Sequence, residues 1–370
     1  MELQAKKKSF WGTFKNAYLK SRNLKRFWKN LDKKNLSNEL INTFDIYLNS
    51  ESYNWSAKIW RHTIMNHLKL MSKFEQKNYE NLIMQEYFTF TYFDEKLIKD
   101  ACAEIENKTI KLNVNLFKKQ NNFTLMQSVN HNLILLMLYE NIKNRNIFKY
   151  LNKIRSPSDH KPSLIIDGNE ITQDNINSLF EYEQIEMLLG KIEKKNNIFL
   201  EVGSGSGRTA KSILSIKNDV KYVIADIPPA INICLNNLKS FFKNKKISTA
   251  FEINDPNELD SALKKNDVLF IFPHQIKLFP KKKFDVAIAI DCLHEMEKKI
   301  IKKYMTMFEE TSKLLYFKVF ENSGLAYSFY ENHSVHNKED YSINEKWTEH
   351  LKKRCLYPSS FFELGYELNI

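Results

Sequence analysis

A histidine and two acidic residues follow an apolar run in the second half of the chain, and together they could support proton transfer. Asp291, His294 and Glu295 stand in "DCLHEM", directly after "FDVAIAI". Because the imidazole group titrates near neutral pH, a neutral histidine can take a proton from a hydroxyl group. His294 is therefore the first candidate for a general base, and Glu295 is either a second base or the group that orients it. The alternative is that His294 caps the next helix and contacts only a bound cofactor.

A second candidate site is the segment "FLEVGSGSGRTA", residues 199–210, which holds three of the 8 glycines in this chain of 370 residues. Glycine allows a positive φ and lets a ligand approach the backbone closely. The spacing excludes a phosphate-binding P-loop, and Arg208 stands where a GxGxxG dinucleotide fingerprint needs its last glycine. The ligand-binding candidates in this segment are Glu201, Gly203, Ser204, Gly205 and Gly207.

Two further polar residues follow apolar runs and could bind a nucleoside. Asp226 ends "KYVIAD", where a carboxylate can accept hydrogen bonds from both ribose hydroxyls, with Ile227 beside it. The alternative role for Asp226 is to cap the helix that follows Pro228 and Pro229. Gln275 follows "VLFIF", where its amide oxygen could accept a hydrogen bond from a ligand.

The surrounding pattern predicts how these residues are positioned. Residues 1–160 show mostly helical spacing, and a turn-rich segment then marks a boundary to a second domain, 161–370. Apolar strands alternate with amphipathic helices in the second domain, which predicts an α/β fold with a mostly parallel sheet. Residues 246–265 are expected to form either an inserted strand and helix or a longer crossover connection. The last 50 residues are expected to add an antiparallel hairpin formed by 325–330 and 361–370.

The sequence from Ile198 to Met296 resembles the class I methyltransferases that depend on S-adenosyl-L-methionine. The acidic residue and glycines of the turn, the acid after the next strand, and the polar end of "FDVAIAIDCLHEM" occur in the family's order. The resemblance implies a Rossmann-like sheet and S-adenosyl-L-methionine as the cofactor. Many relatives carry an aspartate where Gln275 stands, and that aspartate accepts a hydrogen bond from the adenine amino group; the resemblance implies that the Gln275 amide oxygen takes this role. The residues expected to contact the cofactor are Glu201, Gly203, Ser204, Gly205, Gly207, Asp226, Ile227, Gln275 and Asp291.

Residues 164–296 are also similar to a bacterial family of sugar O-methyltransferases associated with surface-polysaccharide biosynthesis. This resemblance implies a saccharide or glycan-precursor substrate. The net charge of +12 leaves a methyltransferase of RNA or protein as an alternative, although no nucleic-acid-binding motif accompanies the charge, so no specific nucleic-acid partner is expected. A non-catalytic Rossmann-like module is a further alternative.

The remaining sequence features concern location and partners. Four scattered cysteines predict reduced thiols in a cytoplasmic protein, and the HxxH of "ENHSVHNKED" predicts a solvated loop, so no metal is expected. Two aromatic stripes near the N-terminus, beside many lysines, predict either a helix that lies on a membrane surface or one that packs on the core. These stripes are Phe10, Trp11, Phe14 and Tyr18, then Leu24, Phe27, Trp28 and Leu31.

Aromatic residues near the C-terminus could form a stacking wall for a sugar ring, or simply pack in the core of the hairpin. They are Tyr327, Phe329, Tyr330, Tyr341, Trp347 and Tyr357.

Overall fold

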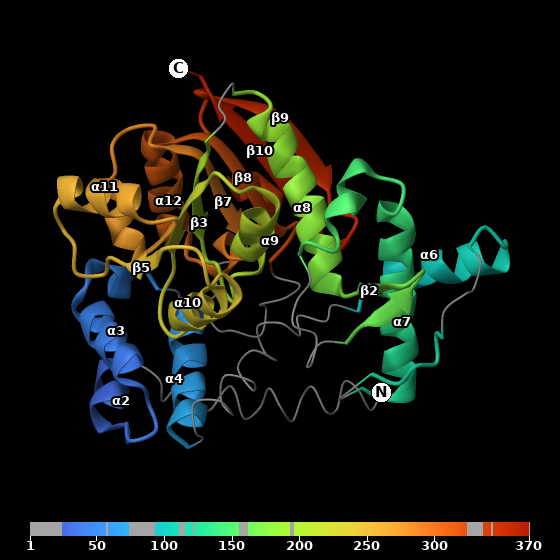
Figure 1. Cartoon of the computed structure of the whole chain (residues 1–370), viewed down its shortest axis with the longest axis horizontal. Helices are drawn as coiled ribbons and strands as arrows, with labels where there is room; N and C mark the ends of the chain where they lie inside the picture. Colours follow the sequence, from blue (N-terminus) through green and yellow to red (C-terminus); the bar gives the residue numbers. More distant parts are fainter. Residues whose placement is uncertain are drawn as a thin grey trace.

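A twisted eight-stranded sheet forms the centre of the molecule (Figure 1). The computed structural model describes residues 24–56, 58–73, 93–110, 115–120, 123–154, 162–192, 196–323, 336–341 and 343–369. The strand order is β5-β6-β4-β3-β7-β8-β10-β9. The strands are β3 (Ile198–Val202), β4 (Lys221–Ala225), β5 (Ile247–Thr249), β6 (Val268–Ile271), β7 (Phe284–Ile290), β8 (Ser312–Phe320), β9 (Trp347–Arg354) and β10 (Phe361–Leu368).

Strands β3 to β8 run parallel to one another, and β10 is antiparallel to both β8 and β9. The predicted α/β fold with an antiparallel C-terminal hairpin is therefore confirmed. The predicted hairpin partner is wrong, because β9 rather than 325–330 pairs with β10; residues 324–335 lie outside the described residues. The chain moves outward from β3 through β4 to the edge strand β5, fills the position between them with β6, and then crosses to β7 on the other side of β3. Strand order thus reverses between β3 and β7.

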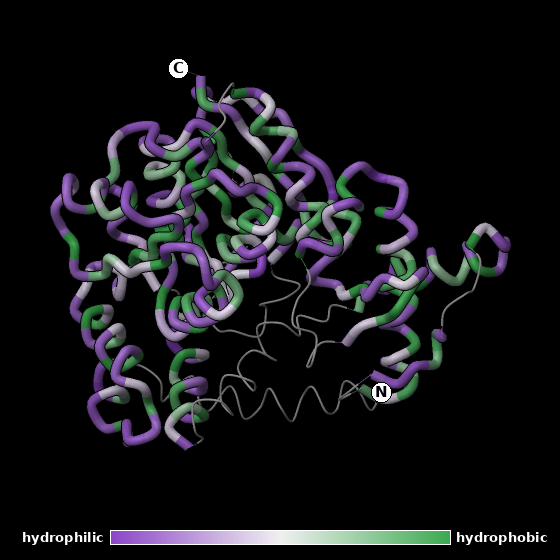
Figure 2. The backbone as a smooth tube through the Cα atoms, viewed as in Figure 1, coloured by the Kyte–Doolittle hydropathy of each residue, from purple (hydrophilic) through white to green (hydrophobic). Residues whose placement is uncertain are grey.

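Helices cover both faces of this sheet. On one face lie α8 (Gln173–Leu189), α9 (Arg208–Ile216) and α10 (Ala230–Phe241), and on the other lie α11 (Pro256–Lys265) and α12 (Lys298–Thr311). The strands are buried on both sides, as expected for a parallel sheet between helical layers. The hydrophobic residues accordingly concentrate in the central strands (Figure 2). Strand β5 and helix α11 confirm the predicted insertion.

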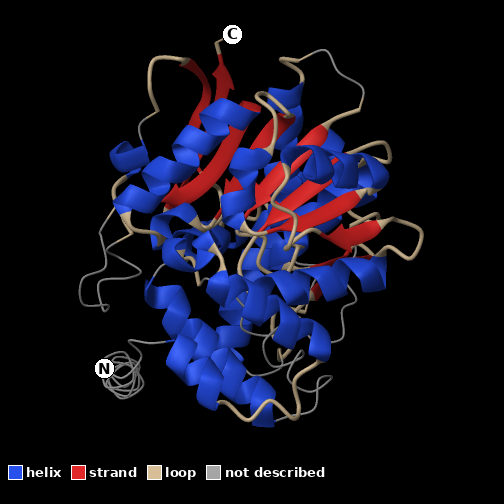
Figure 3. Cartoon of the chain, turned by 90° about the vertical axis from the view of Figure 1, so that its left-hand side faces the viewer, coloured by secondary structure: helices blue, strands red, loops and turns tan. Residues whose placement is uncertain are grey.

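The N-terminal helices α2 (Leu24–Asn30), α3 (Asn38–Asn49) and α4 (Lys58–Lys73) lie below the strands (Figures 1 and 3), and η1 (Glu51–Trp55) joins α3 to α4. They share one hydrophobic core with a face of the sheet. A separate core joins α6 (Glu95–Glu106), α7 (Leu125–Ile142) and the hairpin of β1 (Leu164–Ile166) and β2 (Asn169–Ile171) to α8. The predicted domain boundary near 160 falls in 155–161, outside the described residues, and stays a prediction.

The second aromatic stripe near the N-terminus packs inward. Leu24 and Trp28 are buried in the core, and Phe27 and Leu31 pack against it. The prediction that this stripe faces a membrane is therefore wrong, because the sheet-side core already covers it. The first stripe, Phe10 to Tyr18, lies outside the described residues. None of the helices that the structure describes combines the length and apolar character needed to cross a membrane.

Candidate functional site

A cavity of about 300 Å³ opens at the carboxyl ends of β3 and β7, where strand order reverses. Open α/β sheets bind ligands at this position because the connections leave in opposite directions and open a crevice. The glycine turn and the ends of β4 and β7 form one part of the wall. The N-terminal end of α8 and residues of η1 and α4 complete it.

The glycine turn follows the end of β3, and each of its three glycines has a positive φ. Gly203 has φ 71° and lies so close to Cys292 that a Cβ at this position would come within 2.6 Å of the Cys292 Cβ. Gly207, with φ 84°, is the N-cap of α9, and a Cβ at this position would come within 2.7 Å of the Cys234 Sγ. Glycine is thus required here for its backbone conformation and for close packing, and the turn wraps around one side of the cavity.

Asp226 ends β4 and is buried against the glycine turn. Its Oδ2 accepts hydrogen bonds from the Gly205 N–H at 3.0 Å and the Ser204 hydroxyl at 3.2 Å, and its Oδ1 accepts one from the Ile227 N–H at 2.7 Å. Burial raises the pKa of Asp226 to about 6, although these hydrogen bonds oppose the shift. Asp226 makes no capping bond to α10, whose N-cap is Pro229. Asp226 and Ile227 both line the cavity.

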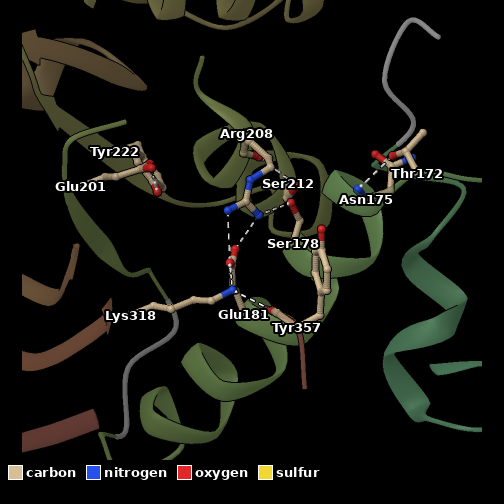
Figure 4. A network of polar contacts seen from close by, with 10 residues as sticks. All are labelled: Thr172, Asn175, Ser178, Glu181, Glu201, Arg208, Ser212, Tyr222, Lys318 and Tyr357. Atoms are coloured by element: carbon tan, nitrogen blue, oxygen red, sulfur yellow. Dashed lines mark hydrogen bonds and ion pairs between the residues drawn. The ribbon is translucent and has the colours of Figure 1, made fainter. Parts of the chain in front are cut away.

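Glu201 lies within β3 and also reaches the cavity wall. It accepts a hydrogen bond from the Tyr222 hydroxyl at 2.7 Å (Figure 4). Burial raises the pKa of Glu201 to about 8, so the carboxyl is protonated at neutral pH.

The structure places Gln275 away from the cavity. Its Nε2 donates to the carbonyl oxygens of Ala250 and Ile253, and its Oε1 accepts from the Phe272 N–H, all within 2.7 Å. The side chain is completely buried. The prediction that Gln275 contacts adenine is therefore wrong: its amide holds the chain between β5 and β6 in place.

Asp291 follows β7 and has a positive φ of 57°, which is uncommon for a non-glycine residue. The residue lines the cavity, and its Oδ1 is buried without a hydrogen-bond partner. Burial raises the pKa of Asp291 to about 6, while the charges of Lys318 and Arg208 act in the opposite direction. A buried acceptor without a partner costs free energy unless a ligand supplies the missing donor.

His294 is almost completely buried, although it lies at the cavity wall. Its ring packs edge-on against Phe320 and Phe361, with ring centres 4.9 and 5.6 Å away. The Phe320 N–H donates to Nδ1 at 3.4 Å. A neutral imidazole whose Nδ1 accepts a hydrogen bond carries its proton on Nε2. His294 makes no capping bond to α12, whose N-cap is Glu297.

Glu295 is partly buried at the cavity wall and accepts a hydrogen bond from the indole N–H of Trp60. Trp60 belongs to α4, and it also lines the cavity. The sequence carries no functional signal for Trp60, because its spacing is that of an ordinary amphipathic helix. This contact brings the N-terminal helices to the polar end of β7.

A buried ion cluster fixes α8 over the ends of the strands (Figure 4). Glu181 of α8 accepts two hydrogen bonds from Arg208, at 2.6 and 3.1 Å, and a third from Lys318 at 3.1 Å. Burial would raise the pKa of Glu181, but the charges of Arg208 and Lys318 outweigh this and hold the pKa below its ordinary value. Lys318 also donates to the Tyr357 carbonyl oxygen, and Arg208 to the Ser178 hydroxyl.

Two residues of α8 that sequence analysis missed lie nearer the start of the helix. Gln173 and Asn177 precede Glu181 by eight and four positions, so all three lie on one face. Both line the cavity, and Gln173 Nε2 and Asn177 Oδ1 are buried without a hydrogen-bond partner. Together with Asp291 Oδ1, they offer one unused donor and two unused acceptors. The four-residue spacing was visible in the sequence, but it did not reveal that this face meets β7.

The three C-terminal aromatic residues that the structure describes, Tyr341, Trp347 and Tyr357, do not gather into one wall. Tyr341 and Trp347 are buried in the core, and Tyr357 reaches the cavity. The predicted stacking wall is therefore wrong for Tyr341 and Trp347; Tyr327, Phe329 and Tyr330 lie outside the described residues. His336 of the HxxH segment forms a hydrogen bond with the Met296 carbonyl oxygen at 2.7 Å.

Comparison with known proteins gives matches among solved structures alone. No family model matches the chain, and no curated protein does. The PH0226 protein from Pyrococcus horikoshii OT3 is 15% identical with a TM-score of 0.35, covering 51% of this chain and 90% of its own. A S-adenosylmethionine-dependent methyltransferase from Clostridium acetobutylicum ATCC 824 is 10% identical with a TM-score of 0.36, covering 51% and 91%.

A third similar structure is magnesium protoporphyrin IX methyltransferase from Synechocystis PCC 6803 with bound SAM. It is 10% identical with a TM-score of 0.35, covering 62% of this chain and 94% of its own. Because all three TM-scores are below 0.5, the fold assignment rests on the strand order and not on these likenesses.

Proposed function

We propose that this protein is an S-adenosylmethionine-dependent methyltransferase that acts on a hydroxyl group of a saccharide. The observation that carries the proposal is the cavity at the reversal of strand order. It combines the glycine turn, the Asp226 carboxyl group and the unpartnered polar atoms of Gln173, Asn177 and Asp291. A nucleoside with a zwitterionic tail matches this set of groups.

The residues present fit such a cofactor. Asp226 would accept from the ribose hydroxyls, since a carboxylate has more acceptor positions than its present partners use. The ammonium group of the tail would donate to Asp291 and Asn177, and its carboxylate would accept from the Gln173 amide. Each of these three buried atoms, which now lack a partner, would then gain one, and the free-energy cost of its desolvation would be offset.

Bound S-adenosylmethionine would supply a methyl group activated by the sulfonium charge, which an acceptor oxygen takes as the carbon–sulfur bond breaks, leaving S-adenosylhomocysteine. The protein must align the acceptor and accept the hydroxyl proton. We assign the proton to Glu295, whose carboxylate is at the cavity wall. The His294 Nδ1 lone pair already accepts from Phe320, so His294 is assigned to positioning the end of β7.

A saccharide acceptor is supported by the similarity of residues 164–296 to sugar O-methyltransferases. A role in bacterial surface-polysaccharide biosynthesis is part of the same proposal. We further propose that the protein works in the cytoplasm. If the protein contacts the membrane surface, the first aromatic stripe, Phe10 to Tyr18, would make that contact.

Isothermal titration calorimetry with S-adenosylhomocysteine tests the cofactor, and absence of binding heat would favour a non-catalytic module. Methyl-tritiated S-adenosylmethionine with a panel of sugars, glycans and RNA tests the acceptor. Glu295→Gln is expected to lower turnover by about two to four orders of magnitude, the usual effect of losing a general base. His294→Gln is the matched comparison. A larger loss of turnover in that variant would indicate that His294 is the general base.

A further inference from the structure

The charged residues around the cavity are mostly acidic. Four acidic residues that can carry a charge at neutral pH line it, namely Asp174, Asp226, Asp291 and Glu295, whereas the carboxyl group of a fifth, Glu201, is protonated. Among the lining residues that the structure describes, Arg208 is the one arginine or lysine, and its guanidinium group is paired with the buried Glu181 in a bidentate contact. Phosphate binding in proteins relies on unpaired arginine or lysine groups, or on backbone N–H groups at a helix N-terminus.

Some backbone N–H groups of the glycine turn already donate hydrogen bonds within the protein. The Gly205 N–H donates to Asp226, and the Gly203 N–H donates to the Ala225 carbonyl oxygen. Because Asp226 and Asp291 are assigned to the cofactor, a phosphate group on the acceptor would meet the carboxyl groups of Asp174 and Glu295, without an unpaired cation among the described lining residues. In a partly buried site, salt only weakly screens the repulsion between a phosphate group and carboxylates.

The end of the cavity near Glu295 has a different character. Trp60 contacts Glu295 there, and Trp55 and Tyr304 also line the cavity, where their rings pack edge-on with centres 6.1 Å apart. The indole N–H of Trp60 fixes the Glu295 carboxyl group on this side. An aromatic surface beside a carboxylate suits a ring that has an apolar face and hydroxyl groups at its edge.

We infer that the acceptor presents an uncharged hydroxylated ring to Trp60 and Glu295, and that phosphorylated acceptors are excluded from the cavity. The inference rests on the proposed function, whose substrate class it narrows. In this arrangement Trp60 both contacts the acceptor and orients the Glu295 carboxyl group. The docked N-terminal helices would thus complete the acceptor site.

The test uses the full chain saturated with S-adenosylhomocysteine. Saturation-transfer NMR and titration would measure binding of methyl glycosides of glucose, galactose, mannose and rhamnose, and of the 6-phosphates of glucose, galactose and mannose. Trp60→Phe removes the donor to Glu295 and part of the ring. Trp28→Phe is the matched control, because Trp28 belongs to α2, donates to Asp45 at 2.7 Å and lies in the core.

We expect at least one neutral glycoside to bind and the phosphates to bind at least tenfold more weakly. Trp60→Phe should weaken glycoside binding about five- to tenfold, as loss of an aromatic contact does, with S-adenosylhomocysteine affinity unchanged, while Trp28→Phe should leave both affinities unchanged. Equal or tighter binding of a phosphate, unchanged glycoside binding in Trp60→Phe, or binding of S-adenosylhomocysteine without any glycoside would each overturn the inference. Failure to bind S-adenosylhomocysteine would instead contradict the proposed function.

Discussion

The Gly205 N–H donates to the Asp226 carboxylate across 3.0 Å, which joins the glycine turn after β3 to the end of β4. The Ser204 hydroxyl reinforces this link at 3.2 Å. The same carboxylate faces the cavity. Asp226 therefore has two connected tasks: it holds the turn in shape, and it offers acceptor positions to a ligand.

Asp226→Ala is expected to weaken S-adenosylhomocysteine binding at least tenfold, because the ligand loses an acceptor and the turn loses an anchor. Calorimetry measures the affinity. Asp255→Ala is the matched control: Asp255 caps α11 through Asn257 and Glu258, away from the cavity. That variant should lose about 1 kcal/mol of stability and retain full affinity. Unchanged affinity in Asp226→Ala would show that the cofactor does not use this carboxylate.

Cofactor affinity should rise with pH between about pH 5 and 7. Burial raises the pKa of Asp226 and of Asp291 to about 6, so both are partly protonated in the free protein near that pH. Hydroxyl and ammonium donors favour the ionised carboxylates, so binding requires proton loss below pH 6. Calorimetry at several pH values tests this, and Asp226→Asn should flatten the dependence. A constant affinity over this range would contradict the assignment.

The same pKa values predict how stability of the free protein changes with pH. An unfolded aspartate loses its proton near pH 4, whereas these two folded carboxyls hold theirs to about pH 6. The native state therefore binds more protons in this window, and their contribution to the free energy of unfolding falls as pH rises through it. Chemical denaturation should show a smaller fall in Asp226→Asn than in the parent protein.

Asn177→Leu separates a ligand-binding role from a structural one. Its Oδ1 is buried without a partner, so replacing the amide should leave the stability of the free protein unchanged or raise it. Binding of S-adenosylhomocysteine should weaken, whereas binding of 5′-methylthioadenosine, which lacks the amino-acid tail, should not change. Thermal shift with both ligands provides the comparison. Equal weakening for the two ligands would argue against the assignment of Asn177 to the tail.

Glu181→Gln should be strongly destabilising, because it leaves Arg208 and Lys318 with an uncompensated buried charge. Breaking a buried ion pair in this way typically costs about 3–5 kcal/mol. Glu183→Gln is the matched control on the same helix, since Glu183 pairs with Arg145 near the surface at 2.7 Å. It should cost at most about 1 kcal/mol. Urea denaturation measures both variants, and similar losses in the two would mean that the buried cluster contributes no special stability.

Local sequence was sufficient to predict the central sheet and one side of the site. The alternation of apolar strands with helices predicted the parallel sheet, because the periodicity of apolar residues in a strand or helix is a property of short segments. The glycine turn and Asp226 follow adjacent strands of that sheet, and parallel strands bring their carboxyl ends to one edge. The glycine turn and Asp226 consequently both line the cavity, as expected.

The other side of the site depends on contacts that no local pattern contains. Trp60 and Glu295 are 235 positions apart and meet because η1 and α4 dock below the strands. Gln275 was wrongly predicted to contact a ligand because it follows β6. Its amide group instead forms hydrogen bonds with backbone groups of Ala250, Ile253 and Phe272. Sequence determined which residue types stand at the ends of the strands. Only tertiary packing decided which polar atoms are satisfied within the protein and which stay unpaired toward the cavity, because hydrogen-bond partners distant in sequence are brought together by folding alone.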